Sequence, residues 1–131
     1  DADIAQMQKI VDDLGSAIRE DGEFETIVSL DLAFHEFICR RADHSRLYTV
    51  WNSMRSQTSM LIGLTTKTHY NYPLQPQELH QQILNSILDN NLMQAEATLA
   101  EHIRDAEQRA RTALQSLRSS GPEDETRPEN S

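Results

Sequence analysis

The sequence has few residues that interrupt regular structure: only 4 glycines and 4 prolines occur in 131 residues. It has a single cysteine, Cys39, which excludes an intrachain disulfide and fits a reducing cytoplasm, where we expect the protein to lie. No apolar run is long enough to span a bilayer and no signal peptide is visible, so we expect no membrane contact. Positive charge is scarce, and the net charge of −9 argues against direct binding of nucleic acid by these residues.

Common catalytic motifs are absent as well. The sequence has no Ser-His-Asp or Cys-His arrangement with supporting context, no glycine-rich phosphate loop and no twin Glu-x-x-His motif of a di-iron bundle. A buried thiol is the simpler interpretation of Cys39. We therefore do not expect an enzyme, and we keep a metal-dependent hydrolase or lyase as the alternative.

Apolar residues recur every three or four positions, which predicts an all-α protein. We predict helices over five segments, about 3–20, 23–42, 45–68, 76–88 and 92–118. Residues 69–75 are predicted to form a loop. Ser45 is the predicted N-cap of the third helix, and Asn91 with Gln94 resembles a capping box at the start of the last.

The end of the chain differs in composition from the rest. From Ser119 onward the sequence contains no hydrophobic side chain to bury and several acidic residues. We expect one domain over residues 1–118, followed by a disordered acidic tail over 119–131.

Four residues that commonly bind metals lie where an apolar helix face would be expected to continue: Asp31, His35, His80 and His102. The first two are four residues apart and therefore share one face of a helix. His80 shares its face with Ile83 and Leu84, and His102 shares its face with Leu99. Buried polar groups are costly unless something satisfies them, and one divalent metal would satisfy all four.

One carboxylate oxygen and three imidazole nitrogens suit Zn²⁺, Ni²⁺, Mn²⁺ or Fe²⁺, and they leave coordination positions open for water or a ligand oxygen. We expect Zn²⁺, with the other three metals as alternatives. The competing interpretation is that each histidine is an ordinary core residue with its own hydrogen bonds. For any single histidine, an ordinary core position is the better interpretation. For the four residues taken together, metal binding is the better one.

Arg55, Gln57 and Thr58 are candidate contacts for a small acid. An arginine that edges toward the core can hold a carboxylate by paired hydrogen bonds, although an exposed arginine explains the same spacing equally well. Solvent exposure likewise explains Gln57 and Thr58. We expect Trp51 to lie in the core. Surface positions are expected for three other residues near these motifs: Glu36, His44 and His69.

The candidate ligands lie in short motifs with a defined order. These motifs are D-x-x-F-H at 31–35, M-R at 54–55, E-x-H-x-x-I-L at 78–84 and L-x-x-H-I at 99–103. Over residues 3–117 their order resembles the FCD family, the effector domain of FadR-type members of the GntR transcription regulators. One departure is a turn in which the family often has Gly-Asn, whereas this chain has Asp43-His44.

The resemblance implies an antiparallel all-α bundle of about five to six helices with a central metal and ligand cavity. It implies that Asp31, His35, His80 and His102 hold the metal, and that a small organic acid completes its coordination with Arg55 as a carboxylate clamp. Family members that lack the metal residues bind fatty acyl-CoA instead, whereas this chain keeps all four.

The resemblance also implies a homodimer that contacts DNA only through an upstream winged-helix domain. We expect that domain and one further helix to lie outside these residues. The expected function is therefore effector sensing in a transcription regulator. Two other classes stay open on the residues alone: the metal-dependent enzyme, and a structural helical module without a ligand.

Overall fold

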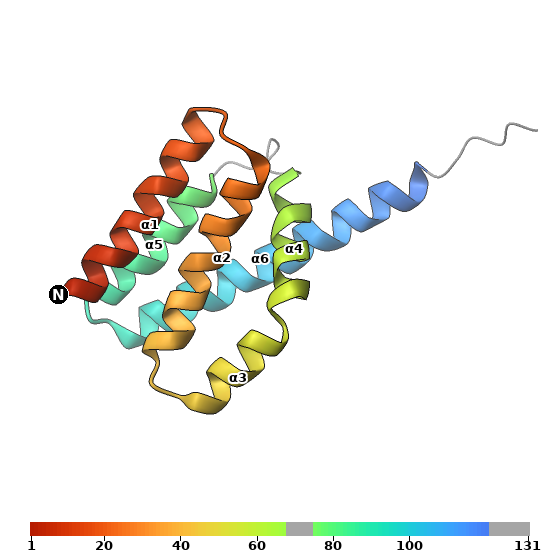
Figure 1. Cartoon of the computed structure of the whole chain (residues 1–131). Helices are drawn as coiled ribbons and strands as arrows, with labels where there is room; N and C mark the ends of the chain where they lie inside the picture. Colours follow the sequence, from red (N-terminus) through yellow and green to blue (C-terminus); the bar gives the residue numbers. More distant parts are fainter. Residues whose placement is uncertain (68–74, 121–131) are drawn as a thin grey trace, which may run out of the picture.

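The structure is a computed structural model that describes residues 1–67 and 75–120. Within these ranges every regular element is a helix (Figure 1): α1 Ala2–Arg19, α2 Phe24–Arg41, α3 Ser45–Ser53, α4 Arg55–Lys67, α5 Pro76–Leu88 and α6 Leu92–Ser119. The predicted all-α helical bundle is thus confirmed. The predicted loop lies almost wholly outside the described residues, as do His69 and the tail beyond Ser120.

The hydrophobic core is formed mainly by three helices. Helices α1 and α5 lie side by side and α2 packs against α1 (Figure 1). The fully or nearly fully buried residues of this core are Met7 and Val11 of α1, Phe34 of α2, and Ile83 and Leu84 of α5. Leu99 of α6 packs against the same cluster. The core therefore holds together the helices that carry the candidate metal ligands.

The contact between α1 and α5 fixes the position of α5. Gly15 of α1 is buried, and a side chain there would collide with the side chain of Gln77. One turn further along α5, the amides of Gln8 and Gln81 exchange hydrogen bonds of 2.8 and 3.1 Å. Since Gln81 directly follows His80, these contacts help to set the position of that histidine on α5.

The third predicted helix is in fact two helices, because the chain breaks at Met54. Met54 is the C-cap of α3, with φ −101° and ψ 2°. Just before it, the Ser53 hydroxyl donates to the Val50 carbonyl at 2.7 Å and competes for a helix acceptor. Such local side-chain bonds bend or end helices without any glycine or proline. The prediction of one continuous helix was therefore wrong.

The cap of α3 also differs from the prediction. His44, and not Ser45, is the N-cap residue, since its Nδ1 atom accepts the Leu47 N–H at 3.2 Å. The cap predicted for the last helix is present, because the Asn91 side chain accepts the Gln94 N–H at 3.1 Å.

The turn before α3 contains a residue in the left-handed region. Asp43 has φ 48°, a conformation that glycine adopts most easily. We expect Asp43→Gly to raise the free energy of unfolding by up to about 1 kcal/mol, because it removes this steric cost. Chemical denaturation would measure the change. Asp89→Gly is the matched control and should not stabilise, since Asp89 already has a helical φ of −70°.

Much of the predicted apolar face of α3 and α6 is exposed. Helix α3 has no buried residue, and Leu47, Val50 and Met54 are 43–55% exposed. Helix α6 extends past α4, away from the core (Figure 1), and its residues Ile103 and Leu117 are 57% and 63% exposed. These apolar residues therefore lie outside the core. None of the described helices is both long and apolar enough to cross a membrane.

Candidate metal centre

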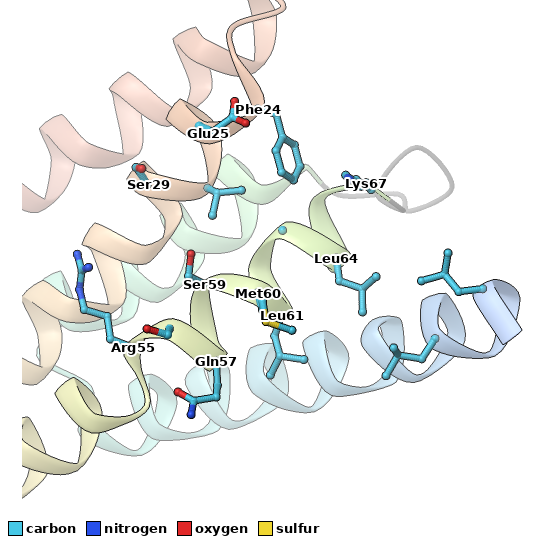
Figure 2. A pocket seen from close by; sticks show the side chains of 15 residues that line it. Phe24, Glu25, Ser29, Arg55, Gln57, Ser59, Met60, Leu61, Leu64 and Lys67 are labelled. Carbon is cyan, nitrogen blue, oxygen red and sulfur yellow. The ribbon is translucent and has the colours of Figure 1, made fainter.

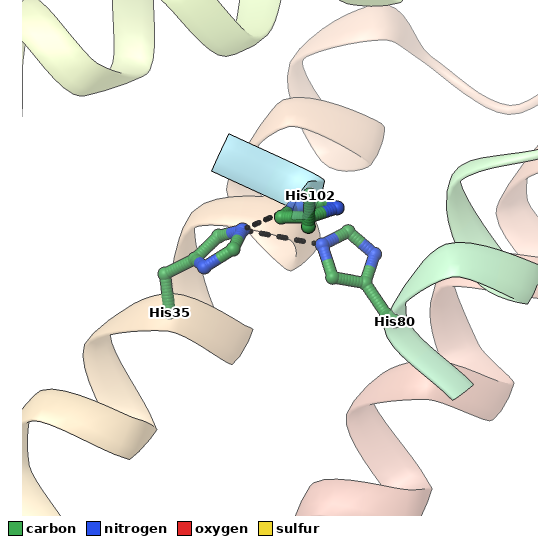
Figure 3. A group of neighbouring side chains, drawn as sticks. All are labelled: His35, His80 and His102. Carbon is green, nitrogen blue, oxygen red and sulfur yellow. Dashed lines mark hydrogen bonds between the residues drawn. The ribbon is translucent and has the colours of Figure 1, made fainter. Parts of the chain in front are cut away.

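The predicted ligands come together from three helices. Asp31 and His35 lie on α2, His80 on α5 and His102 on α6. Figure 3 shows the three imidazoles facing one another, with dashed lines from His35 to His80 and to His102. The Nε2 atom of His35 lies 3.2 Å from Nε2 of His80 and 3.3 Å from Nε2 of His102. The Oδ1 atom of Asp31 lies 3.4 Å from Nε2 of His35 and 3.5 Å from Nε2 of His80.

This cluster lies in the interior of the bundle. The His80 side chain is 1% exposed, and those of Asp31 and His35 are 13% and 16% exposed. The Phe34 ring packs against it, with its centroid 4.7 Å from that of His80. Because the surroundings are apolar and partly closed to water, interactions between these polar groups are stronger than at the surface.

The spacing of the donor atoms fits a coordinated divalent metal. Ligand atoms about 2.0–2.1 Å from a tetrahedral Zn²⁺ lie roughly 3.3–3.4 Å from one another. The four donor distances here, 3.2–3.5 Å, are close to that value. Three Nε2 atoms this close cannot all be paired by protons, because each neutral imidazole has one donor and one acceptor nitrogen. A cation would satisfy the remaining lone pairs.

The protonation states also suit a metal. Burial, the neighbouring His80 and His35 and, to a smaller extent, Arg109 together lower the pKa of His102 to about 3, against the opposing effect of Asp31. His102 is therefore neutral at pH 7, as coordination requires. Burial alone would raise the pKa of Asp31, but the adjacent imidazoles of His80 and His35 outweigh it and hold the pKa below its usual range. Asp31 is thus an ionised oxygen donor.

Two ring atoms in the cluster have unmet hydrogen-bonding capacity. The Nδ1 atoms of His80 and His102 are buried and have no hydrogen-bond partner among the described residues. An unsatisfied buried polar atom costs on the order of 1–3 kcal/mol. If Nε2 binds a metal, Nδ1 carries the proton, and metal-binding histidines usually donate this N–H to a carboxylate, a backbone carbonyl or water.

A cavity of about 640 Å³ opens beside the cluster, and Asp31, His35 and His102 form part of its wall. Trp51, Thr58, Thr65 and Arg109 also line it. Trp51 is only half-buried and forms part of the cavity wall as well as packing inside the bundle, so the prediction of a plain core position was incomplete. The volume lies within the usual range of small-molecule sites, roughly 300–1,000 Å³.

Arg55 and Gln57 lie elsewhere. Figure 2 shows them with Phe24, Ser29 and other residues around a second cavity of about 950 Å³, between α2, α4 and the end of α6. The Arg55 side chain is 51% exposed, and its Nε atom lies 3.2 Å from a carboxylate oxygen of Glu36. Of the predicted acid contacts, only Thr58 is in the cavity that the histidines line.

Glu36 is less exposed than predicted, since 17% of its side chain is accessible, and it binds both Arg55 and Arg40. Arg109 is the site residue that the sequence analysis missed: it is 5% exposed and lines the cavity beside the histidines. The available signal was its position seven residues after His102, two helix turns further along the same face.

One of the comparisons with known proteins found a match. The family model for the FCD domain matches residues 1–105, which include all four predicted metal ligands. No curated protein and no solved structure matched the chain. FCD domains are the effector-binding domains of GntR-family transcription regulators, which act together with a DNA-binding domain. Because the match covers most of its length, this chain belongs to the FCD family.

Proposed function

We propose that this domain senses a small carboxylic acid through a divalent metal held by Asp31, His35, His80 and His102. The observation that carries the proposal is the convergence of three Nε2 atoms and one carboxylate oxygen beside a ligand-sized cavity, which Asp31, His35 and His102 line. When bound, the metal would supply a positive charge with open coordination positions for the acid. Zn²⁺ suits this donor set, and Ni²⁺, Mn²⁺ and Fe²⁺ stay alternatives.

Thr58 adds a preference for the acid's other groups. Its hydroxyl donates to the Met54 carbonyl at 3.0 Å, so its oxygen is left as an acceptor toward the cavity. A hydroxyl group of the effector could donate a hydrogen bond to this oxygen, whereas a carbonyl or carboxylate oxygen could not. We therefore expect a hydroxy acid to bind more tightly than the same acid without the hydroxyl.

The predicted carboxylate contacts of Arg55 and Gln57 stay predictions. Both side chains line the second cavity, and Arg55 already has a carboxylate partner in Glu36. If Arg55 nevertheless clamps the acid, Arg55→Ala should weaken acid binding on the order of 10-fold to 100-fold with metal content unchanged. Unchanged acid binding would assign the clamp to another residue.

Among the described residues, the two non-ligand carboxylates near the site, Glu36 and Glu107, are both paired with arginines, which disfavours the enzyme alternative. A metal-dependent hydrolase or lyase needs a proton acceptor that is not itself a ligand. Glu36 is the nearest in sequence to His35, but its two oxygens contact Arg40 and Arg55 at 3.3 and 3.2 Å. Sensing therefore explains the site better than turnover.

Signalling follows from the position of the ligands on separate helices. An acid that binds one packing of α2, α5 and α6 more tightly than another shifts the balance between the two packings. We propose that this shift repositions winged-helix domains in a homodimer and so changes their affinity for DNA.

The test is titration of a small hydroxy acid, such as lactate or malate, into metal-loaded and metal-free protein by calorimetry. We expect roughly one metal per chain by elemental analysis, and acid binding that is at least about 10-fold weaker without metal. A purified protein that takes up no divalent metal, or binds the acid equally well without it, would contradict the proposal.

A further inference from the structure

We infer that α3 is a gate for the cavity beside the histidines, which swings away from the bundle as one unit and closes again. Its hinges are the turn at Asp43 and the break at Met54. Trp51 is the residue that α3 contributes to the cavity wall, so the wall opens when the helix moves. The opening needs neither metal nor acid, and the inference therefore goes beyond the proposed function. Only the use of the gate for metal and acid exchange rests on that function.

Helix α3 is weakly anchored in the bundle. It lies at the edge, beside α2 and α4 (Figure 1), and none of its nine residues is buried. Its apolar side chains Leu47 and Val50 are 43% and 55% exposed, whereas α1, α2 and α5 each contribute buried side chains to the core. Segments with few buried apolar contacts open locally at a lower free energy than the core. We therefore expect α3 to open while the other helices stay packed.

Both ends of α3 allow the helix to move on its own. Asp43, in the turn before it, has φ 48°, and Met54, after it, has φ −101° and ψ 2°, so neither residue has regular helical backbone angles. Helix α2 ends at Arg41 and α4 begins at Arg55, close to these two residues. Hinges are typically a few residues at the ends of elements, which absorb the change in backbone angles. A rotation at Asp43 and Met54 would thus move α3 without bending α2 or α4.

The polar contacts that hold α3 and the start of α4 against α2 are exposed. The Arg40 guanidinium of α2 donates to the Tyr48 hydroxyl of α3 from two nitrogens, at 3.3 and 3.2 Å. Glu36 of α2 binds Arg40 and also Arg55, the first residue of α4, at 3.3 and 3.2 Å. The two arginine side chains are 62% and 51% exposed, and exposed ion pairs contribute little to stability. These contacts therefore form a weak latch, which thermal motion can break.

Trp51 provides an independent reason for the helix to open. Its Nε1 atom is buried and has no hydrogen-bond partner among the described residues. An indole N–H is a donor only, and leaving a buried donor unsatisfied is costly. Water would satisfy it once α3 moves, so opening relieves a cost that the closed position carries. Because the ring centroid lies 6.4 Å from that of His35, the same movement opens the cavity wall next to that histidine.

The test is hydrogen–deuterium exchange of the purified protein, followed by NMR. A nine-residue helix is barely stable on its own, so opening should expose the amides of α3 as well as the Trp51 indole N–H. We expect these groups to exchange with one common opening constant, at least about 100-fold larger than that of the α5 amides. Exchange that proceeds from the ends of α3 inward would show ordinary fraying and would contradict the gate.

Two variants loosen the latch. Arg40→Gln removes the guanidinium that contacts both Tyr48 and Glu36, and Tyr48→Phe removes the hydroxyl but keeps the ring. Each should increase the opening constant of α3 about 3-fold to 10-fold, with no change at α5. Lys9→Gln is the matched control, since it breaks an exposed ion pair with Asp13 on α1 and should leave the exchange of α3 unchanged.

Release of metal shows whether the opening serves the site. If metal leaves from the open state, its rate of release follows the fraction of open protein. On Zn²⁺-loaded protein, Arg40→Gln should therefore pass its metal to a chromophoric chelator about 3-fold to 10-fold faster than wild type. Lys9→Gln should release metal at the wild-type rate. Faster exchange of α3 in Arg40→Gln with unchanged release would overturn the gate.

The outcomes separate this inference from the proposed function. If the α3 amides exchange only as slowly as those of α5, the gate is wrong while metal-dependent acid sensing stands. If the purified protein binds no metal, but α3 opens as one unit and both latch variants open it further, the proposed function fails while the gate stands.

Discussion

The His80→Ala variant should lose nearly all metal affinity, by more than about 100-fold, because changes to groups that merely support a ligand already cost roughly 10-fold to 100-fold. His80 is fully buried, and its Nε2 atom lies within 3.5 Å of both His35 and Asp31. Competition with a chromophoric chelator, together with elemental analysis, would measure the loss.

The chain provides a matched control for this experiment. His44→Ala makes the same change at a histidine that caps α3 and is exposed. It should cost roughly 1 kcal/mol of stability, as is typical for an N-cap, and leave metal content unchanged. Equal metal content in wild type and His80→Ala would remove His80 from the site.

The second large effect is on thermal stability. Metal binds the folded state, so a metal present at about 1,000 times its dissociation constant should add about 4 kcal/mol to the free energy of unfolding. For a domain of this size, chelation should therefore lower Tm by on the order of 10–20 °C. The difference should shrink as the pH falls toward about 5, because protons compete with metal for the imidazoles.

Differential scanning calorimetry with and without a strong chelator measures this effect. The His80→Ala protein serves as control, since the chelator should not change its Tm. If the chelator has no effect on wild type at pH 7.5 although metal is removed, the metal does not tie the helices together.

The clustering of Asp31, His35, His80 and His102 could be predicted because its signal is local. Asp31 and His35 fall on one helix face by spacing alone, and His80 and His102 each interrupt an apolar stripe. Because the apolar stripe of a helix faces the core, a polar residue within the stripe is expected to be buried as well. The family motifs then predict that residues on helices far apart in the sequence share one site.

The side chains that line the cavity beside the histidines could not be predicted in the same way. Helical periodicity gives the face of a residue but not which of two neighbouring cavities that face meets, and Leu61 and Leu114 line both cavities here. The sequence pattern therefore predicts the same role for Arg55 and Thr58, although the two side chains line different cavities. Arg109 was missed because an arginine on a charged helix is usually exposed. The break at Met54 is not marked by a glycine or proline in the sequence.

The position of Trp51 has a consequence for how the site can be observed. It is the only tryptophan of the chain, so all indole fluorescence comes from α3, a helix without buried residues. Its ring forms one wall of the cavity, close to His35. The emission wavelength of an indole depends on the polarity and water content around it. The protein therefore contains an intrinsic optical reporter in the wall of its own cavity, and events there can be timed by stopped-flow without attaching a dye.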